Sequence, residues 1–335
     1  MSNSVDHLKA MKNQEQLPPY AQHNFLQTRQ KSTAQYLHIN IVSREKICAW
    51  TYSVIDHFGL SRSTVAVSMN LYDRYFAICE NKCEGKFVLL CSISTLYIAI
   101  KLHEPKSSLE RCNLSELSKL SRGHFRTKDI ENMELNILHS LSWLVNPPLA
   151  TDFIHLVLNL PSLTSHSFVH QQVFESSQYM VELTVCDPFF IESSPSVIAF
   201  AAILNALEED IDYLSFSSAN RSKFLQEVRN ALSLNEIDRE VCIHRKRMQK
   251  ILLLQDETME EVKKPQSPLS VCDPGHEFDE HDQRLTNQYW HLRGHRRSSS
   301  ADNIDFSTLN ENKRRRHRRS SSVSSDLRRI SISSG

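Results

Sequence analysis

The chain has 335 residues, a length that corresponds to about two domains of ordinary size. Lys and Arg number 39, as do Asp and Glu, so the formal net charge is zero and indicates no particular class of partner. Only 6 residues are glycine, whereas sheet-rich and dinucleotide-binding folds need glycine at tight turns and phosphate loops. With a hydrophobic fraction of 40%, this composition favours helices around a sizeable core.

The 8 cysteines are scattered singly and form no Cys-x-x-Cys motif. Cys79 and Cys83 are four residues apart, but no second Cys or His pair lies near them to complete a zinc site. Reduced, packed thiols are typical of a reducing compartment.

The polar N-terminus lacks the apolar segment of a signal peptide, and no unbroken apolar run reaches the length of a membrane span. We therefore expect a soluble intracellular protein without a metal or cofactor and without membrane contact.

The N-terminal part begins with a polar segment and continues with segments of helical pattern. Residues 1–22 are polar and contain two consecutive prolines, which predicts a flexible leader, and a weak helical pattern over 23–39 suggests an entry helix. Beyond this segment the apolar residues recur at helical spacing, with Gly59 and Pro105 as stop signals. The expected helices cover residues 43–58, 62–78, 87–102, 114–120 and 128–144.

A second series of helical segments follows two prolines at 147 and 148. One of them begins with Ser194 at the cap and Pro195 at the first helical position, the preferred start of a helix. The expected helices cover residues 149–160, 168–185, 195–209, 220–232 and 235–254. The prediction is an all-α fold of two consecutive five-helix repeats, over 41–146 and 147–255, after a leader over 1–40.

Residues 256–335 are rich in Ser, Arg and acidic residues and contain few large apolar ones. Such a segment cannot bury enough apolar surface to offset the entropy of ordering, which predicts a disordered regulatory tail. A compact basic run in it is typical of a nuclear localisation signal, although a merely solvated basic tail has the same composition. This run consists of Lys313, Arg314, Arg315, Arg316, Arg318 and Arg319.

Four serines of the tail are candidate phosphorylation sites. Three follow Arg-Arg-x, a pattern that suits kinases with acidic pockets, and the fourth precedes a proline. Phosphates beside the basic run would reduce its positive charge and mask the nuclear signal. We expect a nuclear protein that shuttles with the cytoplasm and contacts nuclear import factors. The four serines are Ser267, Ser299, Ser321 and Ser331.

The first predicted helices share an ordered set of residues with a known family. Arg44 is followed six residues later by Trp50, and the next helix ends with Asp73-Arg74 before two aromatic residues. This order resembles the opening of the cyclin box. LLCSISTLYIAIKLHE and DIENMELNIL resemble its third and fifth helices, and YMVELTVCDPFFIESSPSVIAFAAI resembles the second and third helices of the C-terminal cyclin repeat. The resemblance covers about residues 40–255 and leaves the subtype open between A/B-like and D-like.

The resemblance implies a face that binds a cyclin-dependent kinase. Lys101 and Glu134 match the cyclin residues that contact the kinase beside its αC helix, and Leu90 and Glu104 belong to the same region. Taken alone, Lys101 fits a helix-end lysine that interacts with the dipole, and Glu134 fits a solvated helix charge. The resemblance also implies a buried ion pair between Arg44 and Asp73 that ties the first two helices together.

The groove in which many cyclins hold Arg-x-Leu peptides looks altered here. The resemblance assigns Ile47, Trp50 and Leu89 to it, but Ser43 stands where the family has Met, and Ser53 where it has Glu. Leu89 also replaces a Gln that would bind the docking arginine. Because charge-assisted contacts would be lost, we expect weak or changed docking. Trp50 equally suits a plain core position.

The resemblance implies a non-enzymatic subunit that binds and activates a cyclin-dependent Ser/Thr protein kinase to control cell-cycle progression. The sequence contains no phosphate-binding Gly loop, Gly-x-Ser-x-Gly or His-Glu-x-x-His motif. The alternative function is that of a transcription-associated protein with the same fold that binds DNA complexes, because twin helical repeats also occur in transcription factors. Such a protein should carry basic faces, and only the last helix, over residues 239–250, has a basic stretch. Direct nucleic-acid binding is therefore not our expectation.

Overall fold

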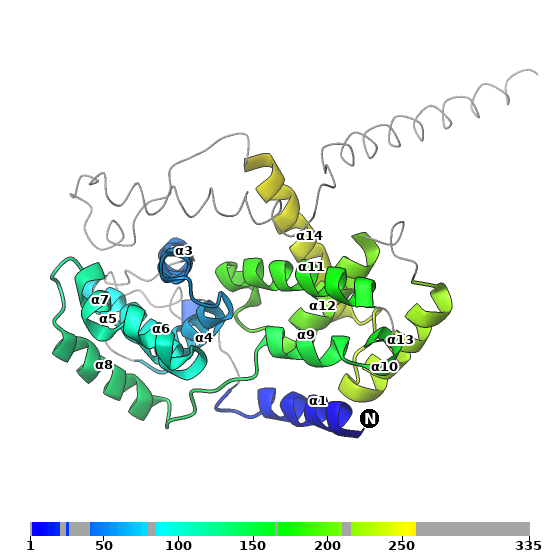
Figure 1. Cartoon of the computed structure of the whole chain (residues 1–335), viewed down its shortest axis with the longest axis horizontal. Coiled ribbons are helices and arrows are strands. Elements are labelled where there is room, and N and C mark those ends of the chain that lie inside the picture. Colours follow the sequence, from blue (N-terminus) through cyan, green and yellow to red (C-terminus); the bar gives the residue numbers. More distant parts are fainter. Residues whose placement is uncertain are drawn as a thin grey trace, which may run out of the picture. The chain divides into compact units, whose positions relative to one another are not determined.

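The computed structural model describes residues 2–20, 25–26, 41–79, 85–164, 167–209 and 216–258. These residues form thirteen α-helices and one 3-10 helix, with no strand among them (Figure 1). The predicted all-α class is therefore confirmed. The helices fall into two groups by their contacts, whereas the number of structural repeats stays a prediction.

The first group packs around α5, which lies against both α4 and α8. Eleven residues of α5 are buried, as expected for a helix that is apolar on several faces. Asn113 caps α7, where its Oδ1 accepts hydrogen bonds from the backbone N of Ser115 at 2.9 Å and of Glu116 at 3.1 Å. The group comprises α3 (Ile41–Phe58), α4 (Ser63–Ile78), α5 (Gly85–His103), α6 (Lys106–Arg111), α7 (Leu114–Leu120) and α8 (Thr127–Ser140).

Among the described residues, α5 alone is long and apolar enough to cross a membrane by length and composition. Its apolar window is 67% buried inside the protein. The helix is accordingly the central core element of the first group, and its apolar character is accounted for by its packing against α4 and α8.

The second group packs around α12, which contacts α9, α11 and α14. The helix begins at Pro195, as predicted, and its residues from Ser196 to Leu207 are buried. Small alanine side chains along it allow close approach of its neighbours. The group comprises α9 (Ala150–Leu158), α10 (Pro161–Thr164), α11 (Ser167–Cys186), the 3-10 helix η1 (Pro188–Phe190), α12 (Pro195–Glu209), α13 (Ser218–Leu232) and α14 (Arg239–Thr258).

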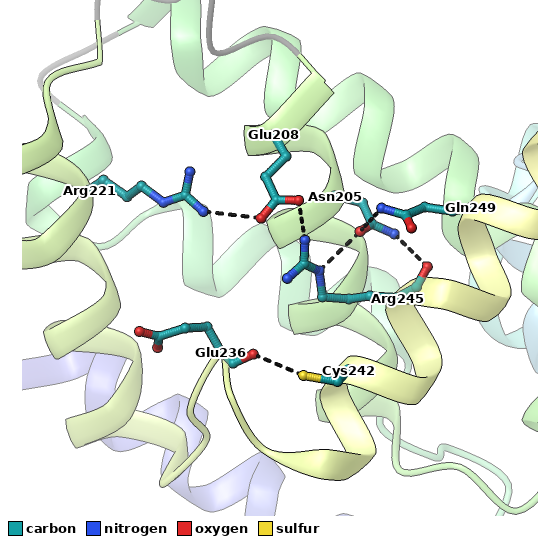
Figure 2. A network of polar contacts seen from close by, with 7 residues as sticks. All are labelled: Asn205, Glu208, Arg221, Glu236, Cys242, Arg245 and Gln249. Atoms are coloured by element: carbon teal, nitrogen blue, oxygen red, sulfur yellow. Dashed lines mark hydrogen bonds and ion pairs between the residues drawn. The ribbon is translucent and has the colours of Figure 1, made fainter. Parts of the chain in front are cut away.

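A polar network fixes α14 and α13 to α12 (Figure 2). The side chain of Asn205, only 1% exposed, accepts hydrogen bonds from Arg245 Nε at 3.1 Å and Gln249 Nε2 at 3.2 Å, and it donates to the Arg245 carbonyl. Glu208 pairs with Arg245 on α14 and with Arg221 on α13. Because both polar atoms of the Asn205 side chain are hydrogen-bonded, its burial carries little penalty.

The N-terminal segment differs from the predicted flexible leader, because Ser2–Glu15 forms helix α1. Leu8 and Met11, three residues apart, are buried in the core of the second group. These apolar residues were the only sequence signal for the helix, and the signal is weak because most of the other residues of α1 are polar. The predicted entry helix over 23–39 lies outside the described residues except for residues 25–26, which are buried.

Glu15, the last residue of α1, fixes the start of α12. Its carboxylate accepts hydrogen bonds from the backbone N of Ser196 at 3.0 Å, from Ser196 Oγ at 2.7 Å and from Lys12 Nζ at 2.8 Å. A carboxylate at a helix N-terminus satisfies orphan N–H groups and interacts favourably with the helix dipole. The α1 helix is therefore held by apolar burial and by a buried charged cap.

Replacing Glu15 with Ala should lower the free energy of unfolding by about 1–3 kcal/mol, because the buried donors of Ser196 lose their acceptor. Urea unfolding monitored by circular dichroism measures the change. The matched control is Lys9→Ala on the exposed side of the same helix, which should stay within about 0.5 kcal/mol of the parent. Equal stability of the two variants would show that the cap contributes nothing.

Candidate functional site

Lys101 and Glu134 form an ion pair at the C-terminal end of α5. The Glu134 side chain is 11% exposed and the Lys101 side chain 37% exposed, so the pair lies at the protein surface with its carboxylate largely covered. Lys101 Nζ also lies 4.4 Å from the centre of the Tyr97 ring, within the range of a cation–π interaction. The structure therefore brings together the two residues that were predicted to contact a kinase.

The surroundings of this pair combine charge with exposed apolar side chains. Burial and the carboxylates of Glu134 and Glu131 raise the pKa of Tyr97. Leu102 and Leu135, the next residues on α5 and α8, are 44% and 49% exposed. These two leucines add exposed apolar area beside the ion pair in the sequence of each helix.

The two other predicted kinase-binding residues are placed differently. Glu104 caps α4, where its Oε1 accepts hydrogen bonds from the backbone N of Ser61 at 2.9 Å and from Thr64 Oγ1 at 2.6 Å. Leu90 is half-buried near the start of α5, about 16 Å along the helix from Lys101 at the usual rise per residue. The structure thus gives Glu104 a local capping contact and separates Leu90 from the ion pair.

Arg44 and Asp73 form a bidentate ion pair between α3 and α4. Arg44 Nε and Nη2 donate to the two Asp73 oxygens at 2.8 and 2.7 Å, and both side chains are at most 4% exposed. Burial alone would lower the pKa of Arg44, but the Asp73 carboxylate more than offsets that effect and raises it. The predicted pairing partners are therefore in contact.

Arg44 also contacts a third helix, which sequence reasoning missed. Its Nη1 donates to the backbone carbonyls of Val185 at 3.0 Å and Cys186 at 3.3 Å, at the C-terminal end of α11. Those carbonyls have no partner within the helix, so a cation there is favourable. A single guanidinium consequently links α3, α4 and α11, and hence the two helix groups.

A second arginine strengthens the same contact between the groups. Arg62 pairs with Asp56 at 3.0 Å and with Glu182 of α11 at 3.0 Å, and its guanidinium carbon lies 4.9 Å from the Tyr52 ring centre. The Tyr52 hydroxyl in turn donates to the Glu182 carbonyl at 2.9 Å. Nothing in the local sequence pattern identifies Glu182 as the partner, because 120 residues separate it from Arg62.

The predicted docking-groove residues are mostly covered. Ile47 is 3% and Leu89 is 5% exposed, and Trp50 is half-buried. Ser53 Oγ donates to the Ala49 carbonyl of its own helix at 3.0 Å, so this hydroxyl already has an acceptor. Weak or changed docking stays a prediction, with Trp50 as the most accessible of the three predicted side chains.

Residues 256–258, the first of the predicted disordered tail, are helical and end α14. The other predicted features of the tail lie outside the described residues, which end at Thr258 in this part of the chain. They are the rest of the disordered segment, the basic run and the four serines. The residues concerned are Ser267, Ser299, Lys313, Arg314, Arg315, Arg316, Arg318, Arg319, Ser321 and Ser331.

Comparison with known proteins gives a consistent family. Residues 6–146 match the family model of the cyclin N-terminal domain. The chain is 26% identical over 171 residues to Cyclin-D3-3 of Arabidopsis thaliana, covering 50% of this chain and 46% of that protein. It is 30% identical over 146 residues to the G1/S-specific cyclin CLN2 of Candida albicans, covering 43% of this chain and 30% of that protein. It is 24% identical over 172 residues to the cyclin homolog of Saimiriine herpesvirus 2, covering 51% of this chain and 65% of that protein.

The fold agrees with these matches. The crystal structure of a viral cyclin from herpesvirus saimiri superposes with a TM-score of 0.56 at 19% identity and covers 76% of this chain and 100% of the viral one. The helical arrangement therefore defines a protein of the cyclin fold. Over residues 6–146 the chain is therefore identified as a cyclin N-terminal domain. The matched region spans less than two thirds of the length of each of the three relatives.

Replacing Asp73 with Ala should lower the free energy of unfolding by about 3–5 kcal/mol, because Arg44 would be left as an uncompensated buried charge. Equilibrium urea unfolding measures the loss. The control is Glu116→Ala, which breaks an exposed ion pair with Lys119 on α7 and should cost less than about 1 kcal/mol. A similar small loss for both variants would contradict a structural role of the buried pair.

Proposed function

We propose that this chain is a regulatory, non-catalytic subunit that binds and activates a cyclin-dependent Ser/Thr protein kinase and thereby controls cell-cycle progression. The observation that carries the proposal is the Lys101–Glu134 ion pair at the surface of α5 and α8. The match of residues 6–146 to the cyclin N-terminal domain supports it, because Lys101 and Glu134 lie within that match and the cyclin resemblance assigns them to kinase contact.

The physical requirement is a shift of a kinase equilibrium. A protein kinase is active only when its β3 Lys pairs with the Glu of its αC helix. A partner that binds this arrangement better than the inactive one shifts the population toward it. Moving the balance from 1:99 to 99:1 takes about 5.5 kcal/mol of differential binding. Exposed apolar side chains such as Leu102 and Leu135 provide area for such binding.

The ion pair would mainly set orientation. Charged contacts across an interface fix register and suppress wrong partners more than they add affinity. Lys101 is already held by Glu134 and by the Tyr97 ring, so little side-chain entropy remains to be lost when a partner binds. This pre-ordering supports a role in recognition of one defined protein surface.

The alternative, a cyclin-fold protein that binds DNA complexes, has less support from the last helix. Two of the arginines in its basic stretch are paired with carboxylates of the same chain. Arg245 contacts Glu208 (Figure 2), and Arg247 Nε lies 2.6 Å from Asp187 Oδ2. Phosphate binding relies on free cationic side chains along a face. Because Arg245 and Arg247 are paired within the chain, only the lysines and Arg239 of this stretch would be available for it.

Co-purification of protein kinase activity tests the proposal. The tagged full chain, expressed in its native cell type, should recover kinase activity, and Lys101→Ala/Glu134→Ala should recover about 10–100-fold less. The double variant removes the contact that orients the partner and leaves the apolar core residues unchanged. Circular dichroism checks that both chains are equally helical.

The matched control is Lys119→Ala/Glu116→Ala, which removes an exposed lysine–glutamate pair on α7 and should leave the recovered activity unchanged. Parental activity with the folded Lys101/Glu134 double variant would show that this face is not the contact. Recovery of no kinase with any of the folded chains would overturn the kinase-binding role and favour the DNA-complex alternative.

We also propose that the basic run of the tail directs the protein to the nucleus through import factors. The support is the density of cationic side chains over residues 313–319. Replacing Arg314, Arg315 and Arg316 with Ala should abolish most nuclear accumulation of a fluorescent fusion. Arg328→Ala/Arg329→Ala in the same tail is the control and should leave the distribution unchanged. A nuclear fraction equal to that of the parent in the triple variant would rule out the signal.

A further inference from the structure

Two thiols meet where the helix groups join. Cys48 lies in the middle of α3, and Cys186 is the last residue of α11. Their Sγ atoms are 2.9 Å apart, although 138 residues separate them in the sequence. A disulfide has an S–S length of about 2.05 Å. The two sulfur atoms therefore need to approach by less than about 1 Å to form a bond.

Hydrogen bonds between α3 and α11 lie on both sides of the thiol pair. Arg44 and Tyr52 lie four residues before and after Cys48 and thus share its face of α3. Arg44 donates to the Cys186 carbonyl, and Tyr52 donates to the carbonyl of Glu182, one turn earlier on α11. The backbone of α11 is consequently pinned to α3 above and below the thiol pair, which keeps the sulfur atoms at short distance.

The thiols differ in their access to solvent. Cys48 is fully buried, and burial raises the pKa of its thiol well above the usual value. Cys186 is half-buried, so a small oxidant has readier access to this residue than to Cys48. The pair thus combines an accessible thiol with a covered one that lies next to it, which is the arrangement of a reacting and a resolving cysteine.

We propose that Cys48 and Cys186 form a reversible disulfide that fastens α3 to α11 in response to hydrogen peroxide. The Cys186 thiolate attacks the peroxide, the O–O bond breaks, and a sulfenic acid and hydroxide result. The Cys48 sulfur then attacks the Cys186 sulfur, and the S–O bond breaks as the hydroxyl leaves with the Cys48 proton as water. In sum, two thiols lose two electrons and two protons, and one peroxide becomes two waters.

The bond would act on the contact between the helix groups. Arg44 and Arg62 hold that contact by ion pairs and hydrogen bonds in the reduced protein, and the disulfide would add a covalent closure of the long loop between the two cysteines. Such a closure restricts the unfolded chain. The inference concerns this contact alone and does not rest on the proposed kinase partner.

The test uses the reduced full chain, exposed to hydrogen peroxide and then analysed by non-reducing peptide mapping and intact mass. The parent should lose the mass of two hydrogens and yield one linked peptide pair that contains Cys48 and Cys186. Its Tm should rise by roughly 5–10 °C on oxidation, and dithiothreitol should reverse the mass change and the Tm change. The control, Cys242→Ser, removes a partly exposed thiol elsewhere and should behave as the parent.

Two variants separate the steps. Cys48→Ser should gain oxygen at Cys186 instead of losing hydrogen, because the sulfenic acid lacks its resolving thiol. Cys186→Ser, which changes the less buried position, should show no change in mass at Cys48 and no rise in Tm. A parent that gains oxygen without a link, or that links any other pair of its cysteines, overturns the proposal. So does a Cys48–Cys186 link that leaves the Tm unchanged, since the bond would then not fasten the helices.

Discussion

The arrangement of both helix groups depends on the guanidinium of Arg44. It neutralises the buried Asp73 of α4 and at the same time satisfies backbone carbonyls at the end of α11. A lysine could not serve all these acceptors, because the planar fork of arginine presents five donors in fixed directions. Since the charge is buried, its contacts are strong and its loss is costly. One side chain therefore sets the geometry within the first group and its contact with the second.

Residues with structural and binding roles are separated along α5. The middle of the helix is fully buried between α4 and α8, whereas its C-terminal end carries Lys101 at the surface. Glu104, three residues later, turns back to cap α4. The helix end that would meet a partner is thus braced by a cap on one side and by Glu134 on the other. This bracing gives the proposed recognition surface a fixed position relative to the core.

The sequence allowed prediction of features that depend on local pattern or on the family order of residues. The longer helices of both groups follow from apolar spacing, and Pro195 and Gly59 mark helix ends as expected. The short helices α6 and α10 and the pairing of Lys101 with Glu134 were not predicted. Long-range partners were not predictable, because no local pattern relates Arg62 to Glu182 or Cys48 to Cys186. Helix α1 was missed for a similar reason. Its two buried residues, Leu8 and Met11, are core residues only because helices much later in the sequence pack against them.

The cap of α12 by Glu15 also bears on how the chain assembles. The two residues that meet there are 181 positions apart, and the first group lies between them in the sequence. During synthesis at the ribosome, α1 emerges long before α12 exists. Its apolar side chains therefore remain unpacked until the second group has been synthesised. Such non-local closure is slow and exposes apolar surface in the meantime. Nascent α1 is therefore a site at which we expect chaperones to act before the second group is complete.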